Sequence, residues 1–137
     1  MRSRATWITW LQVVLAALLA YALVLVFAGA VAAQLFSVLG FGPSESIDSA
    51  AVRDYLKLPF MVLGAVLAGW AVMMMHIVRG PLRDGSPWAR TILIRSVAVW
   101  FVLDTGMSLV LGFPTHAVFN LLFVTALGIP LLALRSP

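Results

Sequence analysis

The sequence predicts an all-α, polytopic membrane protein: a four-helix transmembrane bundle with a short amphipathic helix in its outer loop. Hydrophobic residues make up 63% of the 137 residues and charged residues 10%, against about 45–50% and about 25% in soluble domains. Most of the apolar residues fall in four stretches, each near the roughly 20 residues that a helix needs to cross a bilayer. A soluble domain of this size could not bury so much apolar surface, and a disordered chain has far less of it. We therefore treat residues 1–137 as a single transmembrane domain.

The first apolar stretch predicts a helix at about 12–36. Gln12 and Gln34 lie 22 residues apart, or about 33 Å along a helix, close to the roughly 30 Å of the hydrocarbon core. Arg2 and Arg4 precede this stretch, as basic residues precede a signal sequence. The apolar run is longer than the roughly 7–15 residues of a signal peptide, so we expect a retained helix.

The segment 44–57, between the first and second spans, is the only sizeable polar stretch. Its apolar residues follow helical spacing: Ile47, Ala51, Tyr55 and Leu56. Ser46 or Asp48 could cap such a helix. We expect a short amphipathic helix here, either a lid over the mouth of the bundle or a plain connector, which is the commoner role of loops.

The other three helices are expected at about 59–79, 88–112 and 116–134. Pro59 suits the first turn of its helix, and Gly80 with Pro81 ends that helix. Ser86 and Thr115 are the candidate N-caps of the last two helices. The short turn between those two makes them antiparallel neighbours.

The basic residues predict the orientation. One side of the predicted bundle carries Arg2, Arg4, Arg79, Arg83, Arg90 and Arg135, and the other only Arg53 and Lys57. The basic side is expected to be cytoplasmic. This places both termini inside a multi-pass protein of the cell (inner or plasma) membrane, with Trp7, Trp10 and Trp88 at the inner interface.

The net charge of +4 therefore indicates membrane orientation and anionic lipid rather than nucleic acid. We expect four arginines to contact lipid headgroups: Arg79, Arg83, Arg90 and Arg95. Arg95 lies deeper than the others and could snorkel to the interface. It cannot pair with Asp104, because nine residues place the two half a turn out of phase on one helix.

Asp104 is the unusual residue, because it lies eight residues before Gly112, about 12 Å inside the outer end of its helix. A charge at that depth is costly, at least about 2.5–3.5 kcal/mol, and such residues face the bundle interior or a water-filled cavity. Two interpretations stay open. Asp104 could serve a functional site, or it could be a hydrogen-bonded residue that ties two helices together.

A candidate polar pocket surrounds Asp104, open to the outer face. Trp100, Asp104 and Ser108 are spaced by four and share one stripe, with Thr105 beside it, and His116 and Asn120 are spaced by four on the next helix. Antiparallel packing brings Ser108 and Asn120 to similar depth, with Asp104 slightly deeper and His116 at the mouth of the pocket. Imidazole and carboxyl groups could transfer protons, but the same residues could equally form a satisfied hydrogen-bond network.

We expect neither a metal nor another cofactor. The chain has no cysteine, which excludes disulfides, thiolate nucleophiles and iron–sulfur clusters. Asp104 with one histidine is too few ligands for a metal site. His76 and His116 lie near opposite ends of the predicted bundle, so they cannot share a metal or a haem. The Walker, GxSxG, HExxH, CxxC and GxGxxG motifs are all missing from the sequence.

Three functional hypotheses follow. The small polar portion and the lack of a catalytic motif favour an accessory or interaction subunit, working beside a membrane-protein partner or as a homo-oligomer. A small-molecule or proton-coupled carrier could use the Asp104 pocket. A membrane enzyme that modifies a lipid could use Asp104 and His116 as acid and base. The last two would both fail if Asp104 faced lipid without a polar neighbour.

Overall fold

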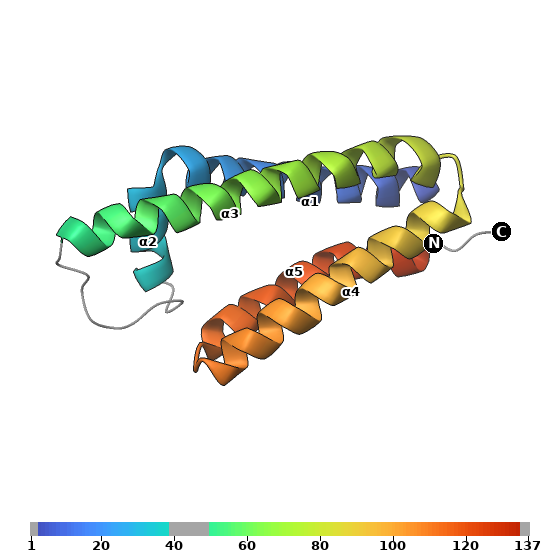
Figure 1. Cartoon of the computed structure of the whole chain (residues 1–137). Coiled ribbons are helices and arrows are strands. Elements are labelled where there is room, and N and C mark those ends of the chain that lie inside the picture. Colours follow the sequence, from blue (N-terminus) through green and yellow to red (C-terminus); the bar gives the residue numbers. More distant parts are fainter. Residues whose placement is uncertain (1–2, 39–49, 135–137) are drawn as a thin grey trace.

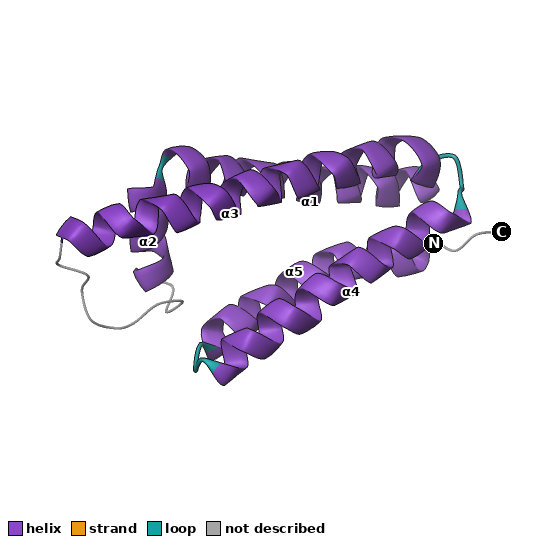
Figure 2. Cartoon of the chain, in the orientation of Figure 1, coloured by secondary structure: helices purple, strands orange, loops and turns teal. Residues whose placement is uncertain are grey.

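A computed structural model of the chain describes residues 3–38 and 50–134, and the regular structure in these ranges is entirely helical (Figure 2). Four segments are long and apolar enough to cross a membrane: Arg4–Phe27, Asp54–Leu82, Pro87–Val110 and Pro114–Ala133. The predicted all-helical class with four spans of membrane length is thereby confirmed.

The first span differs from the predicted helix at 12–36. Helix α1 (Arg4–Phe27) begins eight residues earlier, because the Ser3 side chain caps it by accepting the N–H of Thr6 at 3.2 Å. The backbone leaves the helical conformation at Ala28 (φ −130°, ψ 43°), and α2 (Gly29–Val38) follows as a separate helix. The break falls next to a glycine, the residue that stabilises a helix interior least after proline.

The predicted helix start at Pro59 is wrong, because α3 (Ala50–Ile77) contains this proline in its interior. Because Pro59 has no N–H, the carbonyl of Tyr55, an exposed residue, loses its helical hydrogen-bond donor. Membrane helices tolerate such prolines. The predicted amphipathic segment is therefore not a separate helix over residues 50–57, which form the first turns of α3. The candidate caps Ser46 and Asp48 lie outside the described residues.

The last two helices, α4 (Pro87–Val110) and α5 (Pro114–Ala133), begin and end within two residues of the predicted bounds. The segment η1 (Val78–Leu82) leads from α3 toward α4 and kinks at Gly80, whose φ of −104° and ψ of −106° are not helical. Ser86 occupies the N-cap position of α4 without a capping hydrogen bond from its side chain. Thr115 is not a cap: Pro114 suits the first helical position, so Phe113 precedes α5 instead.

The helices form two antiparallel pairs, α1 with α3 and α4 with α5 (Figure 1). The pairs meet at the end that holds η1 and the start of α1, and they diverge toward the α4–α5 turn (Figure 1). We call the first end the basic end, since Arg4, Arg79 and Arg90 lie there. The opposite end is the outer end. The shared apolar core belongs to the basic half, with Leu11, Leu15, Met74, Val78, Leu93, Leu127 and Leu131 among its buried members.

Two indole hydrogen bonds join the pairs across this core. Trp10 Nε1 donates to the carbonyl of Ala126 at 2.9 Å. This carbonyl has no helical donor of its own, because the residue four positions later is Pro130, which lacks an N–H. Trp70 Nε1 donates to Ser96 Oγ at 3.0 Å and so links α3 to α4. The outer half of the molecule, which holds Asp104, contributes little to the shared core.

Candidate functional site

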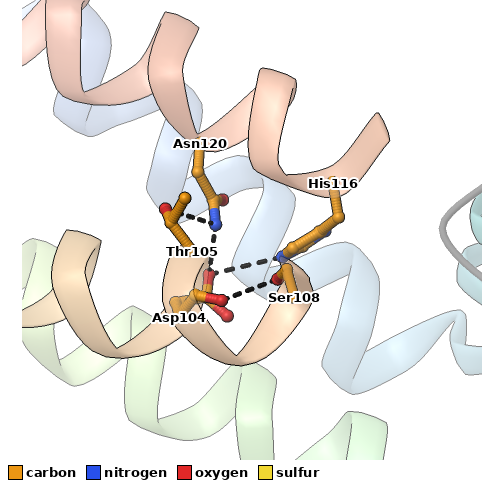
Figure 3. A network of polar contacts seen from close by, with 5 residues as sticks. All are labelled: Asp104, Thr105, Ser108, His116 and Asn120. Carbon is orange, nitrogen blue, oxygen red and sulfur yellow. Dashed lines mark hydrogen bonds and ion pairs between the residues drawn. The ribbon is translucent and has the colours of Figure 1, made fainter. Parts of the chain in front are cut away.

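The polar residues predicted to surround Asp104 lie together on the α4–α5 pair (Figure 3). Asn120 Nδ2 donates to Asp104 Oδ2 at 2.9 Å and also to Thr105 Oγ1 at 3.3 Å. His116 Nε2 lies 3.3 Å from the same carboxylate oxygen. Ser108 Oγ donates to the backbone carbonyl of Asp104 at 2.6 Å. We call these five residues the Asp104 cluster.

The local sequence explains why the cluster forms. Asp104 and Ser108 lie one turn apart on α4, as His116 and Asn120 do on α5, so each helix presents two polar groups on one face. Gly112 has a positive φ of 80°, which lets the chain reverse between α4 and α5 without steric strain. The two polar faces therefore meet at the same depth.

Burial within the cluster is uneven. Asn120 is 1% exposed, whereas the side chains of His116 and Asp104 are 22% and 39% exposed. Both hydrogen bonds to the carboxylate reach Oδ2, and Oδ1 has no hydrogen-bond donor within residues 3–38 and 50–134. No fully buried side-chain polar atom lacks a partner in those ranges. The α4–α5 pair thus satisfies one half of the carboxylate and leaves the other half accessible.

Elements of the other pair flank the cluster. The ring of Phe36, from α2, lies 6.4 Å from the His116 ring between centroids. On α1, the phenol of Tyr21 lies within electrostatic range of Asp104. Asp104 therefore has polar neighbours and lies where the two helix pairs diverge, so the hypotheses that need a polar pocket are not eliminated.

Trp100 was predicted in the same stripe but makes no hydrogen bond within the cluster. Its ring packs one turn deeper, 6.1 Å from Trp70 and edge-on to Phe123 at 5.4 Å. Trp100 therefore packs among aromatic side chains one turn deeper than Asp104. Phe36 was missed by sequence reasoning, because a phenylalanine in an apolar helix carries no signal that it will reach a histidine distant in the chain.

The four arginines expected at lipid headgroups differ in their surroundings. Arg90 is partly buried, and its Nε donates to the carbonyl of Leu131 at 2.7 Å, near the end of α5, where a cation is electrostatically favoured. Arg79, Arg83 and Arg95 are exposed. Sequence reasoning missed the internal role of Arg4, whose guanidinium donates to the carbonyl of Leu82 at 2.8 Å.

The cluster combines a carboxylate, an imidazole, a carboxamide and two hydroxyl groups. Asp104 Oδ1 can accept a hydrogen bond or a proton, and His116 can relay one. No group of three or more acidic, histidine or cysteine side chains that could hold a metal occurs in the described part of the chain. Neither a family model, nor a curated protein, nor a solved structure matches this chain significantly.

Proposed function

We propose that this chain is a multi-pass protein of the cell membrane with its basic end in the cytoplasm and its four helices packed as one unit. The arginine-rich end and the outer end lie at opposite ends of the molecule (Figure 1). At the outer end of α3, Lys57 pairs with Asp54 at 2.6 Å, which offsets its charge. Arg53 is the other basic residue on the outer side, so the excess of positive charge lies at the basic end, as in cytoplasmic membrane faces.

Within that membrane we propose that the protein is an interaction subunit, whose partner is a transmembrane helix seated where the two helix pairs diverge. The observation that carries this proposal is the half-satisfied carboxylate of Asp104. In lipid, an unpaired carboxylate oxygen is costly. A hydrogen-bond donor on a partner helix would satisfy it, and such bonds contribute about 0.6–2 kcal/mol to helix association. The partner is a different membrane protein or a second copy of the chain.

Photocrosslinking in the protein's own membrane tests this proposal. Met107 is 54% exposed and lies three residues after Asp104, on the same side of α4. Val102, 67% exposed, projects from the opposite side and is the matched control. A benzophenone amino acid at Met107 should give a discrete polypeptide adduct in fixed ratio, while one at Val102 gives lipid adducts.

In the variant that carries the benzophenone amino acid in place of Met107, adding Asp104→Asn should weaken that adduct, because it removes the charge to which the partner's donor binds. The proposal fails if Met107 and Val102 label alike, or if the Met107 adduct is indifferent to Asp104→Asn. An adduct with twice the mass of the chain would identify the partner as a second copy.

A proton-coupled carrier is the second candidate, favoured by the 3.3 Å contact between His116 and the partly exposed Asp104. This reading predicts that the purified protein in liposomes moves a proton with its substrate, and that Asp104→Asn abolishes the movement while circular dichroism shows unchanged helicity. The same variant therefore separates the two candidates, since an interaction subunit reconstituted alone transports nothing.

A further inference from the structure

Two cavities lie along the α1–α3 pair, away from the Asp104 cluster. The first, about 410 Å³, lies between α1 and α3 and is lined mainly by apolar side chains, with His76 and Arg79 among its lining residues. The second, about 420 Å³, lies beside the start of α1, and its lining includes four polar or charged residues: Arg4, Thr9, Gln12 and Arg83.

The two cavities share one face of α1. The lining residues of α1 follow each other in steps of three or four: Ala5, Thr9, Gln12, Ala16, Ala20 and Leu23. Residues at this spacing lie in a single row along a helix. On the other side, Val72, His76 and Arg79 line the first cavity and Arg83 the second. The cavities therefore follow one another along the same face of α1, the one with cationic residues at the basic end and the apolar one (the trough) deeper, and we call the two together the groove.

The apolar cavity is close to one lipid leaflet in length. Leu15 and Leu23 are its first and last lining residues on α1 and lie 8 residues apart, about 12 Å along the helix, against about 15 Å for half of the hydrocarbon core. Its floor is formed by Leu15 and Ala71, both buried. Ala16 and Ala20 also line the cavity, and their small side chains leave space that larger residues would fill.

The cationic end is held in place by the fold. Arg4 donates from Nε to the carbonyl of Arg83 at 3.4 Å and from a terminal nitrogen to that of Leu82 at 2.8 Å. These bonds fix the guanidinium of Arg4 beside the exposed side chain of Arg83. The hydroxyl of Thr9 and the amide of Gln12 complete a lining of hydrogen-bonding groups that suits a phosphate.

We propose that this groove binds one anionic phospholipid from the leaflet at the basic end, with its phosphate against Arg83 and Arg4 and one acyl chain over Ala16 and Ala20. Cationic groups at the mouth and an apolar trough of leaflet depth are complementary to both parts of such a molecule. This site is independent of the Asp104 cluster and of the partner proposed for it.

Native mass spectrometry of the purified protein, with phosphatidylglycerol or phosphatidylcholine added to the detergent, tests the proposal. One phosphatidylglycerol should remain bound in preference to phosphatidylcholine. Arg83→Gln should weaken its binding about fivefold, the effect of one basic residue near an anionic lipid. Arg95→Gln, which removes an equally exposed arginine outside the groove, should leave the binding unchanged.

Filling the trough provides a second test. Ala20→Leu should reduce retention of phosphatidylglycerol, whereas Ala17→Leu, at an exposed alanine that does not line the groove, should not. Circular dichroism verifies that both variants remain helical. Equal retention of the two lipids, equal effects of the two leucine variants, or displacement of the lipid by inorganic phosphate alone would each overturn the proposal.

Discussion

Replacing Gly64 by alanine should push α1 and α3 apart. A Cβ at this position would lie 2.6 Å from the carbonyl oxygen of Ala22, 2.8 Å from Val26 Cγ2 and 2.9 Å from Leu25 Cβ. Ordinary contacts are about 3.5–4.0 Å, so the helices must separate by about 1 Å. The nearest of these atoms belongs to the backbone of α1, so a change of side-chain rotamer cannot relieve the clash. Overpacking of this kind costs about 1–3 kcal/mol.

Gly69 provides the matched control on the same helix, because a Cβ there meets nothing within 4 Å. Both substitutions gain the same helix propensity, about 1 kcal/mol, so the difference between the two variants isolates the steric cost. Gly69→Ala should therefore be more stable than Gly64→Ala by about 1–3 kcal/mol.

Reversible unfolding in mixed micelles, with sodium dodecyl sulfate as denaturant and circular dichroism as the signal, measures this difference. Thermal unfolding of the same samples provides an independent check. Equal stability of the two variants, or a more stable Gly64→Ala, would refute the packing of α1 against α3 described above.

Three further predictions concern polar contacts and use the same unfolding measurement. Trp10→Phe should destabilise by about 0.6–1.7 kcal/mol, but much less in a Pro130→Ala background, where the restored backbone N–H satisfies the α5 carbonyl; an equal loss in both backgrounds would contradict this role. Asn120→Asp should destabilise the protein by about 1–3 kcal/mol, because it removes the N–H donor to Asp104 and places two carboxylates side by side. Adding Asp104→Asn should recover most of this loss. Trp70→Phe should cost at least about 0.6 kcal/mol, since the bond to Ser96 of α4 is lost and the smaller phenyl ring replaces the indole; unchanged stability would contradict the role of this bond.

Hydrophobicity predicted the four spans, because the length of an apolar run depends on local composition alone. It failed at helix ends, where polar residues continue a helix beyond the apolar run. Arg4 belongs to α1 and residues 50–57 to α3, although both lie outside the apolar runs that predicted these helices. The break at Ala28 was equally invisible, since the residues on both sides of it are apolar.

The membership of the Asp104 cluster was predictable because it depends on two local facts, a spacing of four on each helix and a short turn between them. Trp100 met the same spacing yet packs elsewhere, since its indole ring finds aromatic partners a turn below. The contacts between the helix pairs were not predictable. They depend on helix rotation, which neither periodicity nor depth determines when all faces of a helix are apolar.

The proline in α5 shows how such long-range contacts could be inferred. A proline within a membrane helix leaves a carbonyl without its donor, and in lipid this group must find another one. The carbonyl of Ala126 therefore requires a hydrogen-bond donor from outside α5, and Trp10 of α1 lies at that depth. Such a donor fastens the pairs together in the basic half, beside the shared core.

In the outer half, the hydrogen bonds that the side chains of Asp104 and Asn120 make lie within the α4–α5 pair. Separation of the pairs there disrupts few buried contacts, so the cost of admitting another helix is lowest beside Asp104. The half-satisfied carboxylate and the least constrained part of the fold thus coincide. This coincidence is what the proposed interaction site requires, because a partner helix would gain a hydrogen bond without breaking the core that holds the protein together.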